Sequence, residues 1–115
     1  MLNKRKRRPS HPGALLREIL ASEEAGLTQG EVATRLKVSR LTVSELVNER
    51  RAVTPDMAHR LARLFETTPD LWLNMQKAVD VWDAWNANRA TYNKIRPLSA
   101  HQRKGKARER TALAS

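Results

Sequence analysis

The sequence contains no cysteine, which excludes disulfides and thiolate chemistry and is typical of a protein from a reducing cytosol. No apolar run approaches the roughly 20 residues that a membrane span needs, and the basic N-terminus lacks the apolar stretch of a signal peptide. We therefore expect a cytoplasmic protein without a membrane partner. A chain of 115 residues is sized for one domain with a modest core, which a partner subunit could supplement.

Patterns of catalysis and metal binding are also missing. The histidines His11, His59 and His101 are scattered without the spacing of metal ligands. The sequence has no glycine-rich phosphate loop, no nucleophile motif and no Glu-x-x-His pair. We therefore expect no metal, no cofactor, no small-molecule substrate and no enzymatic activity.

The charge is concentrated at the two ends of the chain. The formal net charge is +10, yet residues 10–91 hold ten basic and eleven acidic residues. Residues 1–9 contain five cations and no acid, and residues 92–115 contain seven cations and one acid. We therefore expect a basic arm (1–9), a domain (10–91) and a basic tail (92–115), with both ends disordered. Such ends are typical of arms that bind polyanions or of solubilising tails.

Helix start signals recur at short intervals between these ends. Pro12 opens a first helix, with apolar residues at positions 15, 16, 19 and 20, that ends near Gly26. The sequence Thr-Pro-Asp at 54–56 and again at 68–70 opens a fourth and a fifth helix, because threonine caps, proline fits the first position and an acid suits the positive end. No segment has the period of a strand. The fold class is therefore all-α, with five helices.

The second and third helices are short, and each has its own cap. Thr28 and Glu31 form a capping box for a helix that runs to about Leu36. Ser39 caps a third helix that ends near Asn48. Only two residues separate this pair, which predicts a helix-turn-helix whose second helix enters the major groove of DNA.

The third helix has one anchoring side and one presented side. With Arg40 set at 0° on a helical wheel, Ser44 lies at about 40° and Leu41 at about 100°. The apolar residues Val43, Leu46 and Val47, together with Ser39, lie at about 240–340°. The first side is therefore expected to face DNA and the second to face the core.

The presented side carries groups that suit DNA. Arg40 can pair with two guanine acceptors, Leu41 can contact a thymine methyl, and Gln29 can bind a phosphate at the start of its helix. Glu45 would repel phosphates, so it either accepts from a cytosine amine or pairs with a nearby arginine, and we favour the arginine. The expected DNA contacts are Thr28, Gln29, Ser39, Arg40, Leu41, Ser44, Glu45, Asn48, Arg50 and Arg51.

A resemblance to a known family covers roughly residues 11–85. The stretches Leu27–Ala33 and Val38–Ser44 resemble the lambda-repressor-like (Xre-type) helix-turn-helix family. A wider set of residues is similar to the HigA-type antitoxins: His11–Gly13, Asn48, Arg51, Thr54–Ala58, Pro69, Leu71–Gln76 and Asp80–Trp82. The sequence departs from that pattern at Glu49, where glycine is common and where a glutamate adopts the left-handed conformation less readily. The basic ends are also unlike the pattern and receive no role from it.

The resemblance implies a function. A HigA-type antitoxin neutralises a HigB-type toxin, which is a small ribonuclease that cleaves messenger RNA, and represses its own operon as a dimer bound to double-stranded operator DNA. The alternative is a free-standing Xre-type transcriptional regulator without a toxin. A third reading, a nonspecific coating protein driven by its basic ends, does not need so developed a recognition helix.

Two further surfaces are expected from the sequence. The fifth helix carries a wide aromatic stripe, and because tryptophan is enriched at interfaces, we expect a two-fold dimer contact through Trp72, Met75, Val79, Trp82 and Trp85. A core-facing helix is the alternative. A ribonuclease is usually basic, so we expect the toxin to contact the acid-bearing first helix and its end, through Arg17, Glu18, Glu23 and Glu24.

Overall fold

The computed structural model describes residues 7–99, which form five α-helices and no strand. By internal contacts the chain divides into two units, one up to Ala84 and one from Trp85 onward. The all-α, five-helix prediction is confirmed. The helices are α1 (Pro12–Ala21), α2 (Gln29–Leu36), α3 (Arg40–Val47), α4 (Pro55–Phe65) and α5 (Pro69–Lys94).

The caps predicted from the sequence hold the starts of the middle helices. The hydroxyls of Thr28, Ser39 and Thr54 each accept from the backbone N–H three residues later. Thr68 does the same at the start of α5. In the capping box the Thr28 hydroxyl also donates to the Glu31 carboxylate, at 3.2 Å. These bonds satisfy N–H groups that have no partner inside the helix.

The first helix ends earlier than the sequence suggested. It stops at Ala21 rather than near Gly26, and the N–H of Ser22 donates to carbonyls of the last turn. Gly26 lies in the turn that follows, with a φ of 58°. Gly26 therefore marks the turn between α1 and α2 and not the end of α1. Glycine adopts this conformation without steric cost.

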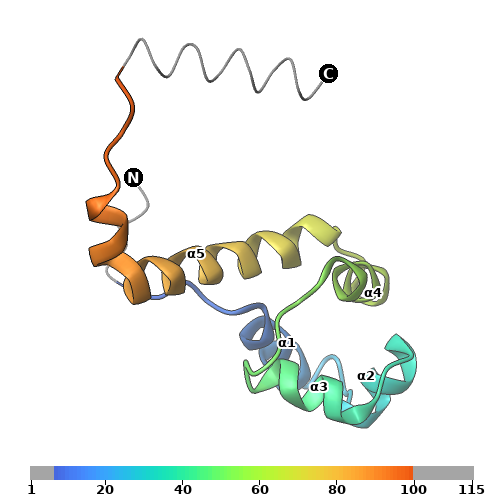
Figure 1. The fold of residues 1–115 in the computed structure, drawn as a ribbon. Helices are drawn as coiled ribbons and strands as arrows, with labels where there is room; N and C mark the ends of the chain where they lie inside the picture. Colours follow the sequence, from blue (N-terminus) through green and yellow to red (C-terminus); the bar gives the residue numbers. More distant parts are fainter. Residues whose placement is uncertain (1–6, 100–115) are drawn as a thin grey trace, which may run out of the picture. The chain divides into compact units, whose positions relative to one another are not determined.

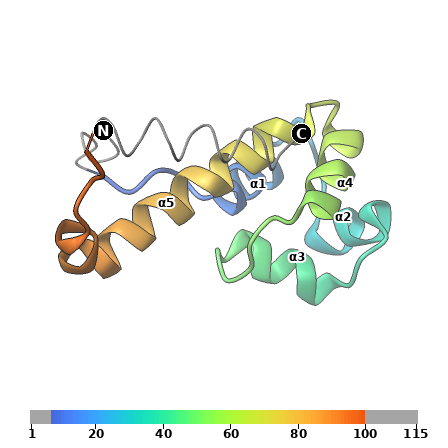
Figure 2. The ribbon, with the colours of Figure 1, turned by 45° about the horizontal axis from the view of Figure 1, so that its top comes forward.

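The core of the first unit lies between α1, α2, α3, α4 and the first turns of α5. In Figures 1 and 2, α2 and α3 lie side by side, and α1 packs against α3 while α4 packs against α2. The apolar side of α3 is buried, as predicted. The core consists of Leu16, Val32, Ala33, Leu36, Val43, Leu46, Val47, Val53, Met57, Ala58, Leu61, Ala62 and Trp72.

One face of the fifth helix is buried within the first unit. Trp72 is 0% exposed and Val79 is 1% exposed, so both pack inside this chain. Neither can supply a contact to a second subunit, which corrects the prediction that placed them at the dimer interface. The helices α1–α4 are short, and the side of α5 that carries Trp72 completes the core that they form. The indole N–H of Trp72 also finds a partner, the Thr67 hydroxyl at 2.8 Å.

The second unit begins inside α5. Asn88 departs from helical geometry, with φ −128° and ψ 21°. The rings of Trp85 and Tyr92 stack across it with centroids 5.7 Å apart. The helix continues to Lys94, three residues beyond the expected domain boundary at 91. Of the expected basic tail, residues 100–115 lie outside the described residues.

Candidate nucleic-acid interface

The turn between α2 and α3 is tightly built. Lys37 adopts the left-handed conformation, with φ 61° and ψ 44°, and its N–H caps the end of α2. The next N–H, from Val38, donates to the Ala33 carbonyl at 3.0 Å. Arg60 of α4 donates to the Leu36 carbonyl at 2.7 Å. The angle between the two helices is thus fixed by local bonds and by α4, which makes the pair a helix-turn-helix in structure.

The third helix presents the side that the sequence assigned to DNA. Leu41 is 67% exposed, an unusual position for a large apolar side chain, while Val43 and Leu46 on the other side are buried. Arg40 and Arg50 are exposed, and neither has an ion-pair partner in the part of the chain that the structure describes. Guanidinium groups without a partner suit contacts with guanine or phosphate.

Glu45 pairs with an arginine, as the sequence predicted. Its carboxylate accepts from Arg51, with Oε1 2.7 Å from Nη2 and 3.3 Å from Nε. This pairing reduces the repulsion that the carboxylate would exert on a phosphate.

The remaining predicted DNA contacts lie on the same surface or at the helix starts. Ser44 is half-buried and Asn48 is exposed at the end of α3, with the Asn48 amide 3.5 Å from the Ser44 hydroxyl. Thr28 and Ser39 are exposed but occupied as caps, since their hydroxyls accept from backbone N–H groups. Their role at DNA would therefore be to orient helix starts. Gln29 opens α2.

His11 has a structural role that the sequence pattern did not lead us to predict. Its side chain is 4% exposed, and Nδ1 accepts from the Gly13 N–H at 2.9 Å, so this histidine caps α1. Burial lowers the pKa of His11, opposed by the nearby Glu49 carboxylate. A neutral ring is required for this bond because only an unprotonated nitrogen can accept. The signal was its position directly before Pro12, which is the cap position of a helix.

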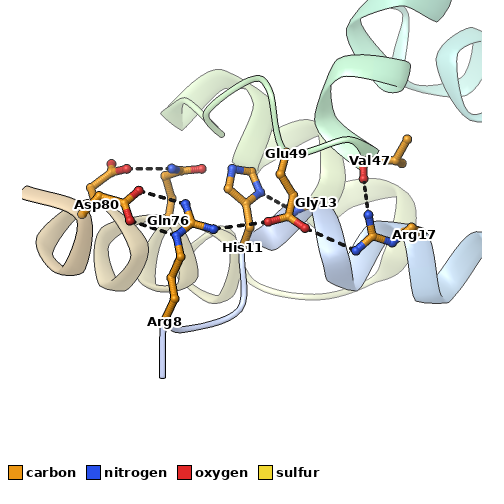
Figure 3. A network of polar contacts seen from close by, with 9 residues as sticks. Arg8, His11, Gly13, Arg17, Val47, Glu49, Gln76 and Asp80 are labelled. Carbon is orange, nitrogen blue, oxygen red and sulfur yellow. Dashed lines mark hydrogen bonds and ion pairs between the residues drawn. The ribbon is translucent and has the colours of Figure 1, made fainter. Parts of the chain in front are cut away.

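Glu49 occupies the left-handed conformation that the sequence analysis questioned. Its φ is 60°, and the N–H of Arg50 closes the turn on the Glu45 carbonyl at 2.8 Å. Figure 3 shows its carboxylate between two arginines, Arg8 and Arg17, which are 3.4 and 3.3 Å away. The turn thus keeps the glycine-like shape, and ion pairs hold the glutamate there.

Arg17 and Arg8 serve the folded domain, which the sequence did not indicate. Arg17 donates to the Val47 carbonyl at 2.8 Å, so its guanidinium joins α1 to the end of α3. Arg8 pairs with Asp83, and Pro9 is buried. Two residues of the expected arm, Arg8 and Pro9, therefore contact the first unit, while residues 1–6 of that arm lie outside the described residues.

The comparisons with known proteins agree with this geometry. A family described as helix-turn-helix matches residues 16–72. The antitoxin HigA-1 of Vibrio cholerae is 39% identical over 98 residues, which are 84% of this chain and 90% of that protein. The chain belongs to the HigA-type helix-turn-helix family.

Other known proteins are similar to this chain over comparable lengths. The uncharacterized HTH-type transcriptional regulator YbaQ of Escherichia coli is 48% identical over 81 residues, 70% of each chain. A structure of the Pseudomonas aeruginosa antitoxin HigA with the higBA promoter has 39% identity and a TM-score of 0.73, covering 80% of this chain and all of that one. The antitoxin GraA in complex with its operator has 37% identity and a TM-score of 0.73, covering 84% and 98%. None of the helices in residues 7–99 has the length and hydropathy that crossing a bilayer requires.

Proposed function

We propose that this HigA-type chain is an antitoxin that binds operator DNA as a homodimer and represses its own operon. It also neutralises a HigB-type toxin, which cleaves messenger RNA, by forming a complex with that toxin and not by catalysis. The observation that carries the proposal is the presented side of α3. It joins two arginines without ion-pair partners among residues 7–99 to the exposed Leu41. Family members of the same fold have been solved with promoter or operator DNA. In this reading, Arg40, Leu41 and Ser44 contact bases, whereas Gln29, Asn48, Arg50 and Arg51 contact phosphates.

Arg40→Ala should lower affinity for the operator by about 5- to 150-fold, because a bidentate arginine–guanine pair contributes about 1–3 kcal/mol to discrimination. It should also relax base preference at one operator position, whereas Arg51→Ala should weaken all sequences alike. Fluorescence anisotropy on operator and scrambled duplexes measures both effects. The matched control is Arg63→Ala, which removes an exposed cation from α4. Equal losses for Arg40→Ala on both duplexes would show that Arg40 does not read a base.

For the toxin, the contact is proposed at the acidic end of α1. Glu18, Glu23 and Glu24 are exposed, and none has an ion-pair partner within residues 7–99. Their negative charge complements a ribonuclease that is basic because it binds RNA. Glu18 lies on α1, and Glu23 and Glu24 lie in the turn that follows it, so none of them belongs to α3. We therefore expect one subunit to hold DNA and toxin at the same time.

Reversing all three charges to lysine should weaken toxin binding by at least tenfold and leave operator affinity within about twofold, since the new lysines would face a basic toxin and like charges at an interface repel. Deleting residues 2–7 should do the opposite: it removes four cations, and the salt slope of DNA binding falls with the number of phosphates neutralised. Calorimetry with the toxin and anisotropy with DNA separate the two. If the deletion abolishes toxin binding and the triple reversal does not, the N-terminal arm holds the toxin.

A free-standing regulator is the second candidate function. It is favoured by the 48% identity to the HTH-type transcriptional regulator YbaQ, whose name carries no toxin. Both candidates use the same α3 surface, so DNA binding does not separate them. Co-expression of the chain with the product of the adjoining reading frame does. Co-purification of a small ribonuclease supports the antitoxin, and its absence supports the regulator.

A further inference from the structure

A buried amide joins α5 to the segment that follows the recognition helix. Gln76 is 7% exposed, and its Oε1 accepts from the N–H of Val53 at 2.8 Å. Its Nε2 donates to Asp80 Oδ1 at 2.9 Å. An apolar residue would fill this position without needing partners, whereas a buried amide is tolerated only when its bonds are made. The amide thus holds the segment after α3 at one place along α5.

An arginine near the N-terminus makes a second link between the same two parts. Arg8 Nε and Nη2 donate to the two carboxylate oxygens of Asp83 at 2.9 and 2.8 Å, which is the fork geometry of a strong ion pair. This hydrogen bond lowers the pKa of Asp83. The third nitrogen, Nη1, reaches Glu49 Oε1 at 3.4 Å. Figure 3 shows Arg8 lying between α5 and the Glu49 turn.

The recognition helix itself is included in this network. Glu49 stands two residues after the last residue of α3, Val47, and binds Arg17 with its other oxygen at 3.3 Å. Arg17 also donates to the Val47 carbonyl. The end of α3 is therefore joined to α1 through Arg17 and to α5 through Arg8, in addition to the Gln76 bond.

We propose that Gln76 and Arg8 are positioning residues that set the spacing between the two half-sites of the operator. The inference rests on the proposed function, a homodimer that reads DNA with α3, and on the expectation from the sequence that this dimer forms through α5. In such a dimer the separation of the recognition helices depends on how α3 is fixed relative to α5. Both side chains of the Arg8–Asp83 pair are exposed, so solvent screens its contribution to stability. The main effect of the bonds made by Gln76 and Arg8 is to fix the direction of α3 relative to α5.

The test uses full-length chains and synthetic DNA. Wild-type protein first selects binding sequences from randomised 40-base-pair duplexes, which defines the half-site and its preferred spacing. Duplexes with that half-site are then made with the spacing changed by one and two base pairs, together with a duplex that has a single half-site. Affinities are measured for Gln76→Met, for Arg8→Ala and for the control Lys77→Ala, which alters an exposed α5 residue outside the network.

Gln76→Met should bind the preferred spacing about tenfold more weakly than wild type and the single half-site within twofold, so that preference among spacings flattens. Arg8→Ala should act in the same direction by about threefold, and Lys77→Ala should change nothing. The double variant Gln76→Glu with Asp80→Asn should restore the preference. The new carboxylate can accept from Val53 N–H, and the new amide can donate to that carboxylate.

The outcomes are separable. If wild type selects no paired half-sites, the proposed function fails and this inference fails with it. If wild type shows a spacing preference that both Gln76→Met and Arg8→Ala retain, only the inference is overturned. A loss shared equally by the single half-site would show a general weakening of the domain, which also overturns it. Arg8→Ala keeps the test decisive if Gln76→Met fails to fold, because Arg8 is exposed.

Discussion

Gly13→Ala should destabilise the protein by about 3 kcal/mol or more, as expected when a side chain is forced into a filled site. A Cβ at this position would lie 1.8 Å from the Leu46 carbonyl oxygen and 2.9 Å from its carbonyl carbon. These are backbone atoms of the recognition helix, so relief requires α1 and α3 to move apart. His11 Nδ1, at 3.1 Å, blocks a shift in another direction.

Urea denaturation followed by circular dichroism measures this loss, with Gly30→Ala as the matched control. Gly30 also lies in the first turn of a helix, but the nearest atom to its Cβ would be Thr28 Oγ1 at 3.9 Å. Because alanine favours helix over glycine, the control should be neutral or stabilising by up to about 1 kcal/mol. Equal effects of the two substitutions would show that α1 and α3 are not closely packed at Gly13.

Trp82→Glu combined with Trp85→Glu should convert the proposed dimer to a monomer and lower operator affinity by about 10²- to 10⁴-fold. Two linked recognition helices bind far more tightly than one because the second contact is intramolecular. Buried charges without partners oppose association. Light scattering measures the mass, and anisotropy measures the affinity. If the chain stays dimeric after both changes, Trp82 and Trp85 do not form the interface.

We propose that this interface extends along α5 toward its N-terminal end. Leu71, Met75 and Ala78 line a hollow with Pro9 and Ser10 on the side of α5 next to the buried residues. Their spacing continues to Trp82 along the same helical face. Met75→Glu should therefore weaken the dimer as well, whereas Lys77→Glu, on an exposed part of the same helix, should leave it intact.

Local features of the fold were readable from the sequence. Each of the caps at Thr28, Ser39 and Thr54 accepts from an N–H only three residues away, so residue type and position suffice to predict it. The presented and anchored sides of α3 follow from helical periodicity for the same reason. The pairing of Glu45 with Arg51 spans six residues and was still within reach of such reasoning.

Features that depend on distant parts of the chain were decided by tertiary structure alone. A stripe on α5 has the same spacing whether it packs on a core or on a second subunit, so only the fold showed that Trp72 and Val79 are core residues. The left-handed turn at Glu49 is held by Arg8, 41 residues away, and the Val53 amide is satisfied by Gln76, 23 residues away. Periodicity and capping rules extend over a few residues, whereas these contacts form only once all five helices have packed.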